Sequence, residues 1–357
     1  MKRDLSVLLD LVRTLAACTV FLAHLSLPRF GGEAIYPIFE PYAHSAVIVF
    51  FVLSGFLISW VAERDGSMTE YLLNRAARIY SVAFPALLLT WAIDGFLIDN
   101  YPGTLSHNYQ HDAPWRYFPL FITFTTDFWF LSEDAFSNFP YWSLCYEVWY
   151  YIIFGILFFG HGPWRWVVAV VVLLLMGPRL WLLWPIWLAG AYLQKLPLLS
   201  VPSSRLLLLI SFLGLITLKA TGVEDALNSM INHVTSGFAK EHLRYSQYFL
   251  GDYLLTAWIG GVIYAARGAY LTVLSHLHKP IAAAASVSFS MYLTHIPFFL
   301  LFGALFPKQT VTIGILSLSG IAVFGAIFER NKVFFRRFFE VVSNYGRVIH
   351  QVTWVRR

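Results

Sequence analysis

The sequence predicts an all-α membrane protein, a polytopic bundle of about ten transmembrane helices whose two termini both face the cytoplasm. Only 13% of the 357 residues are charged and 58% are hydrophobic, whereas soluble domains average about 25% charged residues. Continuous apolar runs approach the roughly 20 residues that a helix needs to cross a bilayer. A transmembrane β-barrel would instead show short segments of alternating polarity, so the runs favour helices.

Ten apolar runs are candidate spans, and in chain order they are residues 5–27, 45–62, 79–98, 140–159, 166–177, 180–194, 204–220, 248–266, 282–305 and 309–328. The fifth and sixth runs are short and separated by a Gly-Pro-Arg turn, so they form either two short tilted helices or a re-entrant hairpin. The aromatic segment 117–130 contains Asp127 and is too short to span comfortably. We therefore expect that segment to lie at the membrane interface.

The first run looks like a secretory signal peptide, because two basic residues precede it. However, Asp10, Arg13 and His24 interrupt the run, and no small-residue cleavage site follows it. We therefore expect it to be retained as the first transmembrane helix.

The distribution of Lys and Arg predicts the orientation. With the N-terminus inside, most of the 25 Lys and Arg residues fall in connections that face the cytoplasm or in the basic tail. We expect residues 1–328 to form a single transmembrane domain and residues 329–357 to form a cytoplasmic tail. Because topology accounts for the basic residues, the net charge of +5 does not indicate nucleic-acid binding.

The two cysteines, and the carboxylates outside the spans, give weaker indications of function. Cys18 and Cys145 both lie within apolar runs without metal-ligand spacing, so we expect no metal site, and we expect Cys145 to be a buried apolar thiol. The outer loop 99–140 carries five carboxylates against Arg116 alone. Such a loop is either a surface that meets a polar acceptor or an ordinary solvated connection.

Charged groups inside spans cost about 2.5–3.5 kcal/mol each, so each one is a site candidate. Arg13 and His24 are separated by about three turns and about 16 Å along the first helix, and they project from nearly the same face. An anion bound at Arg13 can extend a long reactive arm toward His24. The alternatives are a helix-capping arginine and a hydrogen-bonded histidine of the bundle.

Two further segments can contribute to a donor site. Arg75 and Arg78 share a helix face, and their guanidinium groups suit phosphate oxygens, although positive-inside anchors have the same pattern. The pair Ser54-Gly55 in the second run admits either a thin ligand or a closely packed helix.

The fourth and ninth runs carry the remaining polar candidates. Glu147 lies about two turns inside the membrane, at a depth that His24 can reach, so we expect its carboxylate to orient that imidazole. His295 is a second histidine in the outer half, which either lines the site or makes a structural hydrogen bond. Together these residues predict one long cavity, basic at its cytoplasmic mouth, with histidine and carboxylate deeper inside.

These residues and spacings resemble the acyltransferase 3 family of membrane acyltransferases. The matching segments are Asp10, Arg13 and His24 in the first run, Phe50 to Ile58, Arg75 to Tyr80, Trp142 to Glu147, and Tyr292 to His295. The sequence departs from the family pattern at Leu11, Asn74, Ser81 and Val148.

The resemblance implies transfer of an acetyl or other short acyl group from cytosolic acyl-CoA to a carbohydrate hydroxyl of a cell-surface glycan or glycolipid. It places the protein as a multi-pass protein in a bacterial inner membrane, with acetyl-CoA as donor, no metal and no nucleic-acid partner. His24 is then the catalytic base, assisted by Glu147. The donor-binding residues are expected to be Arg13, Arg75, Arg78, Ser54 and Tyr80, and the acceptor-binding residues Asp10, Trp142, Ser143 and His295.

Three alternatives stay open from the sequence. The acyl group can pass through a covalent acyl-His24 before the acceptor arrives. A transporter or flippase of an anionic or glycolipid substrate would also use buried charges. A membrane acyltransferase with a fatty-acyl donor is a nearer rival, but its motif spacing differs.

Overall fold

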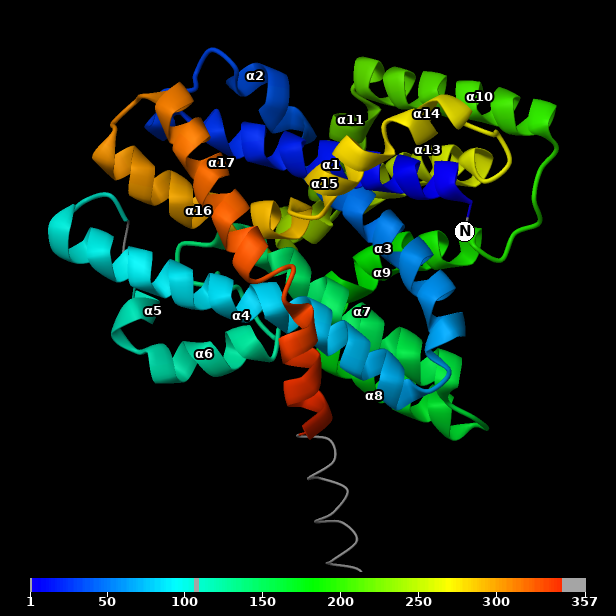
Figure 1. Ribbon diagram of the computed structural model, residues 1–357, viewed down its shortest axis with the longest axis horizontal. Coiled ribbons are helices and arrows are strands. Elements are labelled where there is room, and N and C mark those ends of the chain that lie inside the picture. Colours follow the sequence, from blue (N-terminus) through cyan, green and yellow to red (C-terminus); the bar gives the residue numbers. More distant parts are fainter. Residues whose placement is uncertain (1, 106–108, 342–357) are drawn as a thin grey trace, which may run out of the picture.

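The computed structural model describes residues 2–105 and 109–341, and within these ranges the chain folds into helices without a named strand (Figure 1). By length and composition, eight of the described helical segments can cross a membrane, which confirms the polytopic helical bundle. They comprise α1 (Arg3–Leu25), α3 (Ala43–Asp65) with the short α2 (Tyr36–Phe39) before it, α4 (Met68–Asn100), α7 (Trp142–Phe159), α10 (Val201–Thr221), α13 (Phe249–Ala266), α16 (Ser288–Leu305) and α17 (Thr310–Ile327).

The other two predicted spans form separate short helices. These are α8 (Trp164–Met176) and α9 (Pro178–Leu193), which meet at Gly177. Gly177 has φ 82°, and a Cβ atom there would lie 2.6 Å from the Cα of Trp129, so the turn requires glycine. With 13 residues, α8 spans about 20 Å and is shorter than a hydrocarbon core of about 30 Å. The orientation of the termini stays a prediction.

Two predicted boundaries differ from the structure. Helix α4 begins at Met68, about three turns before predicted residue 79, because the Ser67 side chain caps it by accepting a hydrogen bond from the Glu70 N–H (3.2 Å). The predicted run 282–305 is broken near Val287 into α15 (His278–Ala285) and α16. Part of segment 117–130 belongs to α6 (Pro114–Ile122), and its interfacial placement stays a prediction.

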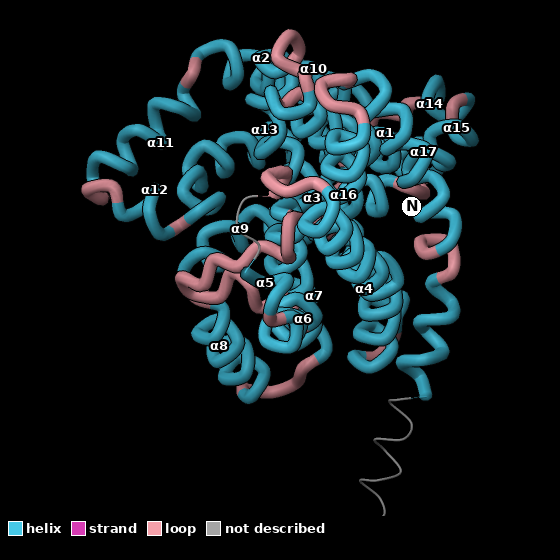
Figure 2. The backbone as a smooth tube through the Cα atoms, turned by 90° about the vertical axis from the view of Figure 1, so that its left-hand side faces the viewer, coloured by secondary structure: helices cyan, strands magenta, loops and turns pink. Residues whose placement is uncertain are grey.

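Helices α3 and α9 cross at two glycines. A Cβ atom at Gly55 would lie 2.0 Å from the carbonyl O of Trp187, and one at Gly190 would lie 2.1 Å from that of Val52. Of the two expectations for Ser54-Gly55, close helix packing therefore explains the glycine. Helices α11 (Val223–Val234) and α12 (Phe238–His242) project to one edge of the molecule, away from α4 (Figure 2).

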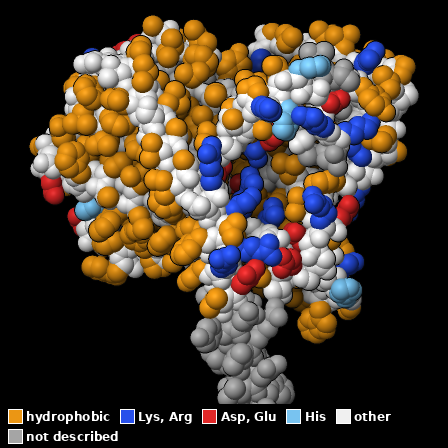
Figure 3. All heavy atoms as spheres, in the orientation of Figure 1, with side chains coloured by type: hydrophobic (Ala, Val, Ile, Leu, Met, Phe, Trp, Pro, Cys, Tyr) orange, Lys and Arg blue, Asp and Glu red, His pale blue; other side chains and the backbone are white. Residues whose placement is uncertain are grey.

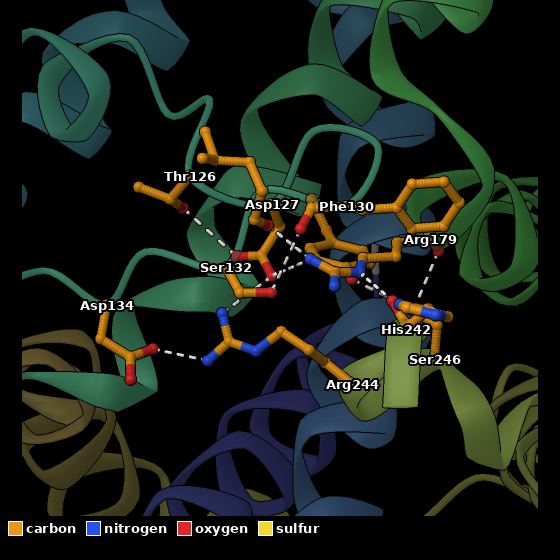
Figure 4. Close-up of polar contacts among 11 residues, drawn as sticks. Thr126, Asp127, Phe130, Ser132, Asp134, Arg179, His242, Arg244 and Ser246 are labelled. Atoms are coloured by element: carbon orange, nitrogen blue, oxygen red, sulfur yellow. Dashed lines mark hydrogen bonds and ion pairs between the residues drawn. The ribbon is translucent and has the colours of Figure 1, made fainter. Parts of the chain in front are cut away.

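A buried ion cluster fixes the loop between α6 and α7 (Figure 4). Asp127 is fully buried, 3.1 Å from Arg244 and 3.8 Å from Arg179, and Arg244 also pairs with Asp134 at 2.6 Å. Burial raises the pKa of Asp127 to about 6, against the opposing effect of the two guanidinium groups. Two of the loop's five carboxylates thus hold the fold together, while Asp134 also lines a cavity.

Candidate active site

A basic pocket opens between α1, α4, α15 and the end of α17. It has a volume of about 300 Å³, and we call it the basic mouth. Figure 3 shows Lys and Arg side chains gathered near the middle of the face, over this region. Its charged lining residues are Arg13, Arg78, Glu329, Arg330 and Lys332.

The basic mouth adjoins a deeper cavity of about 320 Å³, which we call the inner cavity. Arg13 and Arg78 line both. Several of the predicted site residues meet in the inner cavity, namely Asp10, Arg13, Ser54, Arg75, Arg78, Ser143 and Glu147. The three predicted arginines therefore line one cavity, although Arg13 lies on α1 and Arg75 and Arg78 lie on α4.

Two of these arginines have a buried nitrogen donor without a hydrogen-bond partner among the described residues. Arg13 binds Asp10 at 2.8 Å and the carbonyl O of Ala285 at 3.4 Å, but its buried Nε has no hydrogen-bond partner in the described part of the chain. The buried Nε of Arg75 is likewise unpartnered there. Because unsatisfied buried donors are costly, both groups are suited to oxygen atoms of a bound anion.

Glu329 is a member of the basic mouth that sequence reasoning missed. It was assigned to the tail, yet its Oε2 accepts hydrogen bonds from the N–H (3.0 Å) and Oγ (2.7 Å) of Ser290. Burial raises the pKa of Glu329, while the Ser290 hydrogen bonds and the positive charges of Arg78 and Arg13 act to lower it. The sequence feature that could have indicated this role is the position of Glu329, a single acidic residue directly after the last apolar run.

Glu147 does not contact His24, so the predicted pairing of these two residues is wrong. Its Oε1 accepts hydrogen bonds from Ser54 Oγ (2.8 Å) and from the Tyr151 hydroxyl. Trp187 Nε1 in turn donates to Ser54 Oγ at 3.1 Å. Depth along a helix does not fix the side on which a residue points, and Glu147 faces α3 and the arginine end.

His24 lies in the last turn of α1 and faces a cavity of about 520 Å³, which we call the outer cavity. Its aromatic lining includes Phe139, Trp142 and Tyr245, and the ring centroids of Trp142 and Tyr245 are stacked 4.2 Å apart. Its ionisable lining residues besides His24 are Glu40, His44, Lys219, Glu224, Asp225 and Asp252, together with tyrosines.

The partner of His24 is His295. Nδ1 of His24 lies 2.8 Å from Nε2 of His295, and the two rings are nearly parallel at 4°. Nδ1 of His295 lies 2.9 Å from the carbonyl O of Met291, which can only accept a hydrogen bond. His295 Nδ1 therefore carries a proton, and in the neutral pair His295 Nε2 accepts from His24 Nδ1–H. This leaves Nε2 of His24 unprotonated and able to act as a base.

Three predicted binding residues lie elsewhere than expected. His295 is fully buried behind His24 and lines neither cavity, so it does not suit acceptor binding. Asp10 lies at the arginine end, away from the outer cavity. The Tyr80 hydroxyl donates to the carbonyl O of Ile122 at 2.6 Å and is directed toward α6 rather than the arginines.

Trp142 and Ser143 separate to opposite sides. Trp142 lines the outer cavity, as its predicted acceptor role requires, whereas Ser143 lines the inner one. The outer cavity also holds a histidine–carboxylate pair that the sequence did not reveal. His44 Nε2 lies 2.9 Å and 3.0 Å from the two carboxylate oxygens of Asp252. These two residues come from α3 and α13, and no local motif links them.

The family model described as an acyltransferase domain matches residues 7–329. The chain is 29% identical over 150 residues to an O-acetyl transferase of Shigella phage Sf6, covering 41% of this chain and 44% of that protein. It is 36% identical over 92 residues to the acyltransferase MdmB of Streptomyces mycarofaciens, covering 24% and 22%. The chain thus spans less than half the length of each of these relatives. No solved structure gives a significant match.

Proposed function

The chain belongs to the acyltransferase 3 family, and on that premise we propose that it is a membrane-embedded O-acyltransferase that moves a short acyl group from acyl-CoA to a carbohydrate hydroxyl. The observation that supports this most is the His24–His295 pair, which leaves His24 Nε2 free at the outer cavity. The basic mouth and the inner cavity supply the phosphate-binding arginines on the other side.

In this proposal, the donor's phosphate groups bind at Arg13, Arg75 and Arg78, and its arm enters the inner cavity. Glu147 has one oxygen occupied by Ser54 and Tyr151, and its other oxygen can accept an amide N–H of that arm. Because phosphates are anions, the excess of guanidinium groups favours acetyl-CoA over an uncharged donor.

His24 then acts as general base. As the acceptor oxygen attacks the thioester carbonyl carbon, His24 Nε2 takes the hydroxyl proton, and the imidazolium keeps its Nδ1–H bond to His295. The carbon–sulfur bond breaks, and the proton passes from Nε2 to the leaving sulfur. The products are an ester and coenzyme A, and His24 returns to its starting form.

The outer cavity suits a sugar acceptor that carries no negative charge. Stacked Trp142 and Tyr245 offer flat apolar faces, and carboxylates accept hydrogen bonds from hydroxyl groups. Four of the lining residues, Glu40, Glu224, Asp225 and Asp252, are acidic, against Lys219 and two histidines. An anionic acceptor would be repelled there, so we propose a neutral or amino sugar on a glycan or glycolipid.

Replacing Arg78 with Ala is expected to raise the KM for acetyl-CoA by about tenfold or more, because a charge-assisted hydrogen bond contributes about 1.5–3 kcal/mol. The KM for the acceptor should stay unchanged, and steady-state kinetics of coenzyme A release measures both. Arg64→Ala is the matched control, because Arg64 is an exposed arginine that lies over Trp60 near the end of α3. Equal donor KM values for the two variants would make Arg78 a topology anchor only.

Replacing His295 with Phe is expected to lower kcat by about tenfold or more while both KM values stay near those of the intact protein. The variant keeps a ring in the buried space but removes the acceptor that fixes the tautomer of His24. The pH profile of kcat should shift as well, which a purely structural role would not produce. An unchanged kcat would show that His24 works without this partner.

The transporter alternative differs in its products. A transporter moves its substrate unchanged, whereas the proposed enzyme releases coenzyme A when acetyl-CoA and acceptor glycan are supplied together. Purified protein in detergent tests this with a thiol reagent, because a transporter has no compartments to connect there.

A further inference from the structure

The inner and outer cavities meet at lining residues that they share, which we call the partition. Among the described residues, both linings include Val47 on α3 and Tyr292 on α16. The first turn of α7 also stands at this boundary, because Trp142 faces the outer cavity and Ser143 the inner one. The partition therefore separates the arginine end of the site from His24.

Hydrogen bonds hold the Tyr292 side chain across the boundary. Its hydroxyl group lies 2.8 Å from Ser143 Oγ and 3.0 Å from the carbonyl O of Pro140. Its ring packs edge-on against Phe50, with centroids 5.5 Å apart, and the residue is only 6% exposed. Hydrogen bonds of this kind contribute little net free energy each, so the side chain can be released without unfolding its helix.

Helix α16 connects both halves of the site through one run of residues. Ser288 and Phe289 line the inner cavity, Tyr292 lies at the partition, and His295 lies one turn further on, behind His24. Residues three or four apart share a helix face, so α16 presents this series along one side. A donor arm that starts at the arginines meets Tyr292 before it meets His24.

We propose that Tyr292 is the gate of the acyl-transfer path. In the arrangement described, its ring closes the inner cavity toward the outer one, and its rotation away from Ser143 opens the way for the acyl end of the donor. The role in catalysis rests on the proposed function, because only a donor held at the arginines has to pass this point. The closed gate also keeps outer water from the thioester, where it would release a carboxylic acid and the coenzyme A thiol.

Cysteine accessibility tests the gate without relying on catalysis. In a background with Cys18→Ala and Cys145→Ala, Leu57→Cys places a thiol in the inner cavity and Glu40→Cys places one in the outer cavity. A small, membrane-impermeant methanethiosulfonate is added from the side that labels the Glu40→Cys protein. Labelling at Leu57→Cys from that side should be slow with Tyr292, about tenfold or more faster with Tyr292→Ala, and intermediate with Tyr292→Phe.

Tyr253→Phe is the matched control, because it removes a tyrosine hydrogen bond to a backbone carbonyl away from the partition (2.7 Å to Leu182). It should leave the labelling rate at Leu57→Cys unchanged. Equal labelling rates with Tyr292, Tyr292→Phe and Tyr292→Ala would overturn the gate. Since labelling needs no acyl transfer, a gate that fails here is distinguishable from a protein that lacks acyltransferase activity.

Discussion

Replacing His24 with Ala is expected to lower kcat for acyl transfer by about 10²–10⁴-fold, the contribution that a positioned general base makes. The KM for acetyl-CoA should change little, because the arginines and Glu147 that line the donor side lie in another cavity. Coenzyme A release by purified, folded protein in the presence of an acceptor glycan measures both constants.

The control for this variant is His161→Ala, which removes an exposed histidine between α7 and α8. If the His24→Ala variant kept the kcat of the intact protein, His24 would not be the catalytic base. Incubating the intact protein with labelled donor and no acceptor separates the two routes that involve His24. Label bound covalently at His24 would indicate an acyl-enzyme intermediate, whereas its absence agrees with direct transfer.

Replacing Asp127 with Ala is expected to lower the free energy of unfolding by about 3–5 kcal/mol, because Arg179 and Arg244 would keep buried charges without their shared counter-ion. The loss comes mainly from Arg179, because Arg244 keeps its ion pair with Asp134 at 2.6 Å, and not from a large net strength of the ion pairs to Asp127. Thermal unfolding of the detergent-solubilised protein measures the change through its midpoint.

Glu241→Ala is the comparison for Asp127→Ala, since the Glu241 side chain is 77% exposed and pairs only loosely with His242 at 3.9 Å. Exposed pairs of this kind contribute about 0–1 kcal/mol, so the midpoint should barely move. If both variants unfolded at the same temperature, the cluster in Figure 4 would not hold the loop against α9 and the segment before α13.

Composition and apolar runs were enough to predict the fold class, because lipid as a solvent imposes long helices. Helix ends were less predictable. The predicted run starts at residue 79, after Arg75 and Arg78, but the Ser67 cap starts α4 well before these two residues. The break near Val287 has no glycine or proline at its position that would mark it in the sequence.

The arginine end of the site was predictable for a different reason. Charged side chains within apolar runs must face the bundle interior, so Arg13 and Glu147 were expected to face inward. Which cavity each residue faces depends on helix rotation, which the sequence pattern does not determine. The pairing of His24 with His295 joins residues 271 positions apart, and only packing of α16 against α1 brings them together.

Surface glycans from cells that carry the protein test the central claim most directly. Mass spectrometry should find ester-linked acyl groups on these glycans in cells with the intact protein and lose them in cells whose only copy carries His24→Ala. Equal levels of the intact protein and the His24→Ala variant in their membranes are the control for this comparison. The same ester-linked acylation in both cell types would contradict transfer of an acyl group to a glycan by this site.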